Sequence, residues 1–291
     1  MASTRSSPPT DRVIDVLDFL VGRPHERFGL SELARSVGIS KPTCLGIVNA
    51  LVTRGYLVRD PAELTYSLGP ALIAAGRAAQ GGFVVSHVAR RHLEVLSERY
   101  GTPCTASAVV GDQIMVLERT GPAQGSPRVG QLYPFAPPVG LMYVLWDHDE
   151  ALERWLAKPP TLPVRFDRAR LRRIVQQCRQ RGYLVESLTA TGLRLHTLMA
   201  GVAAYDLPPR VQDLIGEVAS SLGERVLLDV DLSARRKQPV NLVAAPTYDA
   251  DGRQELVLTL YVGEAITGAE IARRASALMA AAAQVTAEVA G

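Results

Sequence analysis

Apolar residues in the first 70 positions form three helical stripes, and two short alternating runs follow them. Residues 11–21 place apolar side chains three or four positions apart, and Gly22 ends the stripe. Ser31 is expected to be the N-cap of the second helix. The two alternating runs lie on either side of a turn-forming segment. The pattern predicts helices at residues 11–21, 32–37 and 41–54 and a hairpin of strands at 56–59 and 64–68.

Beyond residue 70 the pattern changes to helices interleaved with pairs of strands. A helical run ends at Gly81-Gly82, which predicts a domain boundary there. Turn signals at Gly111-Asp112 and at residues 249–252 lie at the centres of two hairpins. The expected elements are helices at 71–80, 84–100, 148–157, 168–181 and 267–289 and strands at 105–110, 113–119, 240–247 and 255–262. This order predicts an α+β fold with a largely antiparallel sheet flanked by helices.

The segment from Leu33 to Ile47 has the spacing of a helix-turn-helix. Ala34 supplies the small residue where two helices cross, and Gly38 tolerates positive φ in the turn four positions later. An ordinary three-helix packing unit needs apolar periodicity, but it does not need this Ala–Gly spacing followed by a polar helix start. The hairpin that follows makes the unit a winged helix, and the sequence therefore predicts DNA binding.

The second helix of this motif divides into two faces. Its inward face comprises Cys44, Ile47, Val48 and Leu51. On the outward face Lys41 and Asn49 are the candidates for reading base edges, because lysine pairs with guanine acceptors and asparagine with adenine. Hydroxyls near the helix start suit phosphates, and arginines beside the wing suit the DNA backbone or minor groove. The predicted DNA-binding residues are Ser40, Lys41, Pro42, Thr43, Leu45, Gly46, Asn49, Arg54 and Arg59.

Composition and charge add limits on partners. The chain has 32 Lys and Arg against 29 Asp and Glu, a net charge of +3, so one copy can neutralise few phosphates. We therefore expect a dimer on a palindromic operator of double-stranded DNA. Cys44, Cys104 and Cys178 lie far apart, and we expect no metal and no cofactor. With no long apolar run and no signal-peptide pattern, we expect a soluble cytoplasmic protein without a membrane partner.

Several sequence blocks occur together in an order specific to one family. In the N-terminal part they are residues 11–17, 30–34, 38–43, 55–59 and 66–69. In the C-terminal part they are residues 128–130 with Pro134, 180–183 and 244–249. The chain thus resembles the IclR family of bacterial transcription regulators. The resemblance implies a winged helix-turn-helix DNA-binding domain at residues 1–69, a linker helix at 70–82 and a GAF-like effector-binding domain at 83–291. It also implies homodimers or tetramers and control by a small-molecule effector.

Three features depart from the pattern of that family. Gly46 stands where the recognition helix usually has an arginine, so a main guanine or phosphate contact is missing. The loop after Gly130 lacks the usual Gly-Lys end. The segment between Tyr183 and Ala244 is longer than usual, and it predicts a helical insertion at about residues 188–238 with a candidate strand at 227–232.

The resemblance also implies where the effector binds. In the family the effector cavity is lined by the loop after residue 128 and by the last hairpin. The matching positions are Gly130, Leu132, Phe135, Ala136, Pro137, Val139, Gly140, Leu242, Thr259 and Tyr261. Their apolar majority favours a larger, less polar ligand than a small dicarboxylate. Core packing is the alternative role for Leu132, Phe135, Val139 and Leu242.

Two other functions can be weighed on these residues. An enzyme would need a catalytic constellation, and the sequence has no G-x-S-x-G, no phosphate-binding Gly-rich loop ending in Lys-Ser/Thr and no H-E-x-x-H. We therefore expect no catalysis. A winged-helix protein-interaction module with a ligand-sensing domain is the alternative function, and the weak net charge and Gly46 favour it.

Overall fold

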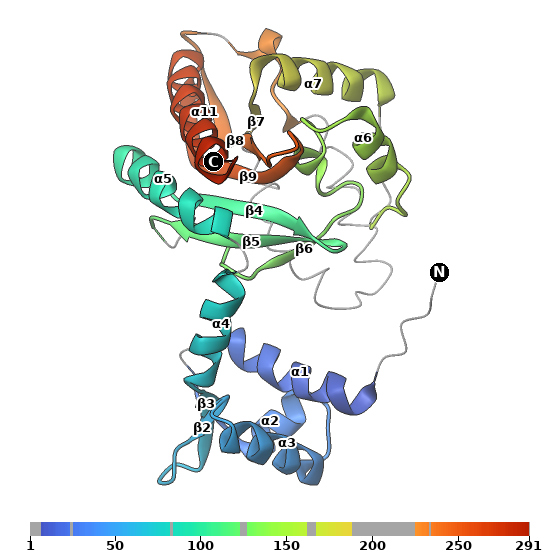
Figure 1. Ribbon diagram of the computed structural model, residues 1–291, viewed down its shortest axis with the longest axis vertical. Helices are drawn as coiled ribbons and strands as arrows, with labels where there is room; N and C mark the ends of the chain where they lie inside the picture. The colour runs from blue at the N-terminus through green and yellow to red at the C-terminus, as the bar shows by residue number, and fades with distance from the viewer. Residues whose placement is uncertain are drawn as a thin grey trace. The chain divides into compact units, whose positions relative to one another are not determined.

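The computed structural model describes residues 7–23, 26–81, 84–122, 127–161, 167–187, 225–232 and 234–290 (Figure 1). The chain divides into two compact units, an N-terminal unit of residues 1–83 and a C-terminal unit of residues 84–291. Each unit is described by itself.

The N-terminal unit is a small helical domain with a three-stranded antiparallel sheet. Its elements are α1 (Pro8–Val21), β1 (Phe28–Gly29), α2 (Leu30–Ser36), α3 (Lys41–Thr53), β2 (Leu57–Arg59), β3 (Thr65–Leu68) and α4 (Ala71–Gly81). The strand order is β1-β3-β2. Leu20, Leu33, Val48 and Tyr66 bring α1, α2, α3 and the sheet to one buried core. The predicted three helices and hairpin are confirmed, and the two-residue strand β1 is an addition.

The C-terminal unit is built on one six-stranded sheet, all of whose strand pairs are antiparallel. Its strands are β4 (Cys104–Val110), β5 (Gln113–Thr120), β6 (Leu132–Pro134), β7 (Leu184–Ser187), β8 (Lys237–Tyr248) and β9 (Gln254–Thr267). The order across the sheet is β6-β5-β4-β9-β8-β7. The other elements are α5 (Val84–Tyr100), η1 (Leu141–Tyr143), α6 (Asp149–Leu156), α7 (Arg168–Arg181), η2 (Asp229–Asp231) and α11 (Gly268–Ala290).

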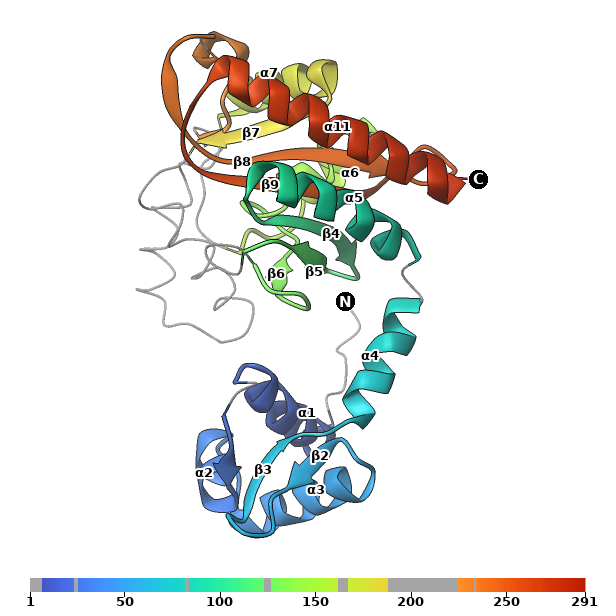
Figure 2. The ribbon, with the colours of Figure 1, turned by 90° about the vertical axis from the view of Figure 1, so that its left-hand side faces the viewer.

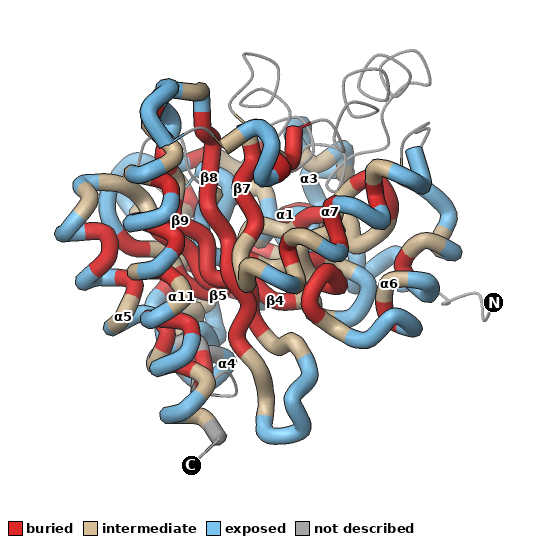
Figure 3. Tube along the Cα trace, turned by 90° about the horizontal axis from the view of Figure 1, so that it is seen from above, coloured by how far each residue is buried: buried red, intermediate tan, exposed pale blue. Residues whose placement is uncertain are grey.

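Helices cover both faces of this sheet. Figure 2 shows α5 and α11 together on one face, with α6 and α7 on the other. On the second face Leu242 and Ala244 of β8 pack against Ile174 of α7. Strand β8 is buried from Val240 to Thr247 and strand β9 from Leu256 to Leu260 (Figure 3). The expected α+β architecture with an antiparallel sheet is confirmed.

The structure corrects several expectations about individual segments. Residues 227–232 do not form a strand: Val226 makes an isolated bridge to Glu186, and a 3-10 turn follows at Asp229–Asp231. Most of the expected helical insertion lies outside the described residues, and Lys237 and Gln238 at its end belong to β8. Strand β7 was not predicted, because its four residues gain strand structure only by pairing with β8, about 60 residues later. The N-cap of α2 is Gly29, so Ser31 lies inside the helix.

Candidate functional site

The turn between α2 and α3 brings the two helices together at Ala34. Ala34 is buried, and its carbonyl accepts a hydrogen bond of 2.9 Å from the backbone N–H of Ile39. Gly38 has φ +66°, a left-handed conformation that glycine adopts without steric cost. The helix-turn-helix geometry expected from this Ala–Gly spacing is therefore present.

The start of α3 is fixed by two hydroxyl side chains. Ser40 is the N-cap, and its Oγ accepts a hydrogen bond of 3.3 Å from the backbone N–H of Thr43. The Ser40 and Thr43 hydroxyls are also 2.7 Å apart and share one hydrogen bond. That bond uses one of the two hydroxyl protons, so the other remains able to donate to a phosphate.

The two faces of α3 agree with the predicted register. Cys44, Val48 and Leu51 are buried, and Ile47 is half-buried against the same core. The outward side chains are exposed, with Thr43 half-buried; these positions are Ser40, Lys41, Pro42, Thr43, Leu45, Gly46 and Asn49. No acidic residue occurs in α3. The helix therefore presents a weakly cationic, partly apolar surface.

The wing is organised by Asp60. Its carboxylate accepts hydrogen bonds from the backbone N–H groups of Ala62 and Glu63, and Arg27 donates to it at 2.7 Å. The two backbone bonds, with a smaller contribution from Arg27, lower the pKa of Asp60. Arg59, immediately before this turn, is exposed. Arg54 is also exposed, directly after α3.

The ten predicted effector positions separate into three groups in the C-terminal unit. Gly130 is exposed in a turn with φ +79°. Leu132, Phe135, Ala136, Pro137, Val139 and Gly140 lie in or just after β6. A Cβ on Gly140 would lie 2.8 Å from the Phe135 ring, so this segment is tightly packed. Phe135 packs against Trp155, which supports the core-packing alternative for Phe135.

The third group lies on the sheet face that α7 covers. Leu242 of β8 pairs with Tyr261 of β9 on one side and with Glu186 of β7 on the other. Directly paired residues share a face of the sheet, so these three side chains form a row across three strands. Thr259 lies two positions from Tyr261 on the same face. Leu242 and Thr259 are 1% and 3% exposed.

The two polar members of this row interact with further polar side chains. We call the whole set the polar cluster: Ser107, Tyr133, Tyr143, Glu186, Arg225 and Tyr261. The hydroxyls of Tyr143 and Ser107 are 2.6 Å apart. Burial raises the pKa of the Tyr133, Tyr143 and Tyr261 hydroxyls, and charge interactions among these hydroxyls and with Glu186 raise it further. The phenols are therefore neutral donors and acceptors at physiological pH.

Arg225 is the member of the polar cluster whose side chain has a buried nitrogen without a recorded hydrogen bond. It is 4% exposed, and its Nη2 has no hydrogen-bond partner among the residues that the structure describes. Burial lowers the pKa of the guanidinium, although the negative charge of Glu186 raises it. A buried guanidinium nitrogen without a partner is costly, so it marks a place where a ligand acceptor would be stabilised.

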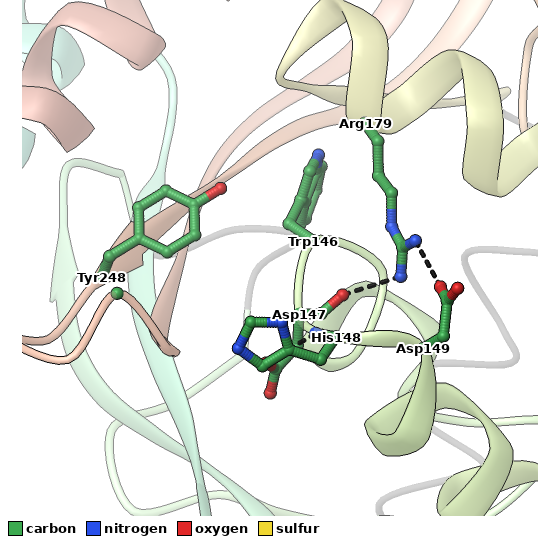
Figure 4. Close-up of a pocket in the computed structure, with 7 residues that line it drawn as sticks. Trp146, Asp147, His148, Asp149, Arg179 and Tyr248 are labelled. Carbon is green, nitrogen blue, oxygen red and sulfur yellow. Dashed lines mark hydrogen bonds and ion pairs between the residues drawn. The ribbon is translucent and has the colours of Figure 1, made fainter.

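A hollow lies beside the start of α6. It has a volume of about 380 Å³ and is lined by Trp146, Asp147, His148, Asp149, Arg179, Tyr248 and Gly252 (Figure 4). Arg179 donates to the carbonyls of Leu145 and Asp147 and to the Asp149 carboxylate. These bonds fasten the turn before α6 to α7, which is a structural role. None of the predicted effector positions lines this hollow.

Comparison with known proteins places this geometry in a family. Residues 9–61 match the IclR helix-turn-helix domain. The fold of nearly the whole chain also matches an IclR transcriptional regulator from Alicyclobacillus acidocaldarius, with a TM-score of 0.63, 21% identity and coverage of 98% of this chain and 100% of that one. The N-terminal unit thus carries an IclR helix-turn-helix domain, and the chain as a whole has the fold of that regulator.

Two further comparisons show the range of similarity. The DNA-binding transcriptional repressor YiaJ of Escherichia coli is 26% identical over 131 residues, which are 43% of this chain and 46% of the repressor. The chain thus matches about half the length of that relative. An IclR homolog from Microbacterium hydrocarbonoxydans complexed with 4-hydroxybenzoate has a TM-score of 0.62 and 18% identity, over 97% of this chain and 98% of that one.

Sequence reasoning named only one member of the polar cluster, Tyr261. Ser107 had a usable signal, because it is a polar residue in the middle of a mostly apolar predicted strand. Glu186 lies in the strand that was not predicted, and Arg225 lies in the segment that was expected to be a helical insertion.

Among the described helices, none is long and apolar enough to span a bilayer.

Proposed function

We propose that this chain is a sequence-specific DNA-binding transcription regulator of the IclR family, controlled by a small-molecule effector. The observation that carries the proposal is the exposed outward face of α3, in a unit that matches the IclR helix-turn-helix domain. The relatives named above are transcriptional regulators, in line with the expectation that the chain is not an enzyme. In this proposal α3 enters the major groove, and the β2–β3 wing lies along the backbone.

The domain roles follow from this assignment. Residues 1–69 bind DNA, residues 70–82 link the domains, and residues 83–291 bind the effector. A net charge of +3 and one lysine on the outward face of α3 give each copy few phosphate contacts. A homodimer, alone or paired as a tetramer, doubles those contacts on a palindromic operator.

The polar cluster supplies the effector site in this proposal. The row of Glu186, Leu242 and Tyr261 offers an apolar centre between two polar groups. Arg225 offers a cationic donor, Nη2, that has no hydrogen-bond partner within the described part of the chain. Such a surface suits a ligand with an apolar body and an anionic or hydrogen-bonding end. The Microbacterium relative binds 4-hydroxybenzoate, which has this combination, so small aromatic acids are the first ligands to test.

Control would act through a shift in population. The effector can change DNA affinity only to the extent that its own affinity differs between the conformation that binds DNA and the conformation that does not. Coupling of this kind changes affinity by typically ~5–150-fold.

The test uses the purified full-length chain and DNA from upstream of its own gene at physiological salt. We expect selective retardation of that fragment over a scrambled duplex, and a decrease in affinity as salt rises, because phosphate contacts release counterions. The absence of a selective complex refutes the proposal. Binding that does not depend on salt favours the protein-interaction alternative.

A further inference from the structure

Two neighbouring residues of α3, Leu45 and Gly46, do not contribute to the described core of the N-terminal unit. Leu45 is 42% exposed, and it lies outside the described core of that unit, which Cys44, Val48 and Leu51 complete from the same helix. An exposed leucine on the surface that faces DNA is an apolar group in a polar setting. On this outward face Leu45 is therefore available to an apolar feature of the partner.

Gly46 is unexplained in a different way. It lies inside α3, its φ is not positive, and a Cβ at this position would have no atom within 4 Å. Alanine would therefore fit, and glycine inside a helix is less stable than alanine. On a face that meets a partner, a missing Cβ lets that partner come closer to the helix backbone.

The spacing along α3 relates these residues to base pairs. Lys41, Leu45 and Asn49 are four residues apart, so each lies about 6 Å further along the helix axis. Successive base pairs are about 3.4 Å apart. Leu45 thus lies about two base pairs from the edge that Lys41 would reach and two from the edge that Asn49 would reach.

We propose that Leu45 contacts the C5 methyl group of a thymine in the major groove, and that Gly46 allows the helix to approach closely enough for this contact. The inference rests on the proposed DNA binding of α3. Thymine presents the one methyl group on the major-groove edges, whereas cytosine presents an N4 amino donor that a leucine cannot accept. Leu45 therefore specifies thymine between a guanine and an adenine.

The first experiment removes the methyl group without changing the pairing. The full-length protein selects its binding sequence from a random duplex pool, and each thymine of the selected half-site is then replaced by deoxyuridine. Replacement of one particular thymine in each half-site should lower the affinity of the wild-type protein about fourfold, which is the effect expected from losing the burial of one methyl group. In Leu45→Ala the same replacement should leave affinity unchanged. Val21→Ala, which truncates an exposed residue of α1, should keep the fourfold effect.

The second experiment separates DNA approach from helix stability. Gly46→Ala should raise the thermal midpoint of the N-terminal unit and yet weaken DNA binding roughly fivefold or more per half-site, as an overpacked contact does. Gly76→Ala is the matched control, because Gly76 is an exposed helical glycine of α4 whose Cβ would also meet nothing within 4 Å. It should raise stability and leave affinity unchanged.

The outcomes distinguish this inference from the function on which it rests. If the pool yields no preferred sequence, sequence-specific DNA binding fails, and the inference fails with it. If a sequence is selected but deoxyuridine acts equally on wild type and Leu45→Ala, the methyl contact alone is overturned. Unchanged affinity in Gly46→Ala overturns the close approach.

Discussion

Replacing Ser40 by alanine tests the local geometry that positions the recognition helix. Ser40 caps α3, and its Oγ accepts from the backbone N–H of Thr43 and bonds the Thr43 hydroxyl. Loss of such a cap costs about 0.5–2 kcal/mol. The backbone bond is long at 3.3 Å and exposed, so we expect the free energy of unfolding to fall by about 1 kcal/mol. For a unit of this size that lowers the thermal midpoint by roughly 4–8 °C.

The chain offers a matched control and a way to assign the transition. Ser31 lies inside α2 and caps nothing, so Ser31→Ala should be neutral or slightly stabilising. Both tryptophans, Trp146 and Trp155, belong to the C-terminal unit. Ser40→Ala should therefore shift the helical circular dichroism transition and leave the tryptophan fluorescence transition in place. Equal losses in the two serine variants, or no loss in Ser40→Ala, would refute the capping geometry.

Three further variants test the C-terminal unit. Burial raises the pKa of Tyr143 in the folded state above its unfolded value. The stability that neutral Tyr143 contributes is therefore complete below about pH 10 and is lost as the pH rises above that value. Urea titrations at a series of alkaline pH values should show a smaller loss of stability in Tyr143→Phe than in the wild type. Gly140→Ala should destabilise by more than Gly130→Ala in thermal melts, since both glycines have positive φ but only at Gly140 would a Cβ clash, 2.8 Å from Phe135; equal losses would contradict that packing. Arg225→Met should cost more than about 1 kcal/mol in urea titrations, because it leaves the buried Glu186 carboxylate without its cationic neighbour, whereas a neutral or stabilising effect would show that Glu186 does not depend on Arg225.

Local chemistry made the N-terminal unit predictable from the sequence. The Ala34–Gly38 spacing, the polar helix start and the Gly22 stop act over fewer than five residues each, and the structure has helices and strands where they predict them. The inward and outward faces of α3 followed from helical periodicity alone. Ser31 was the exception, because α2 begins two residues earlier than its apolar stripe indicated.

The polar cluster was not predictable by the same means. Glu186 joins it through the pairing of β7 with β8, and Tyr143 joins through a contact with Ser107, 36 residues earlier. These contacts depend on the tertiary register of the sheet, which no local pattern specifies. The family resemblance supplied Leu242, Thr259 and Tyr261 as effector positions. The apolar Leu242 has polar neighbours because it pairs with Glu186 on one side and with Tyr261 on the other.

DNA binding by α3 is the central claim, and one measurement tests it most directly. The full-length protein is titrated, near physiological salt, with its selected duplex and with a scrambled duplex of the same composition. The account predicts roughly 10³-fold or greater preference for the selected duplex, and loss of most of that preference in a Lys41→Ala, Asn49→Ala double variant. Equal affinity of the wild-type protein for the two duplexes would contradict it.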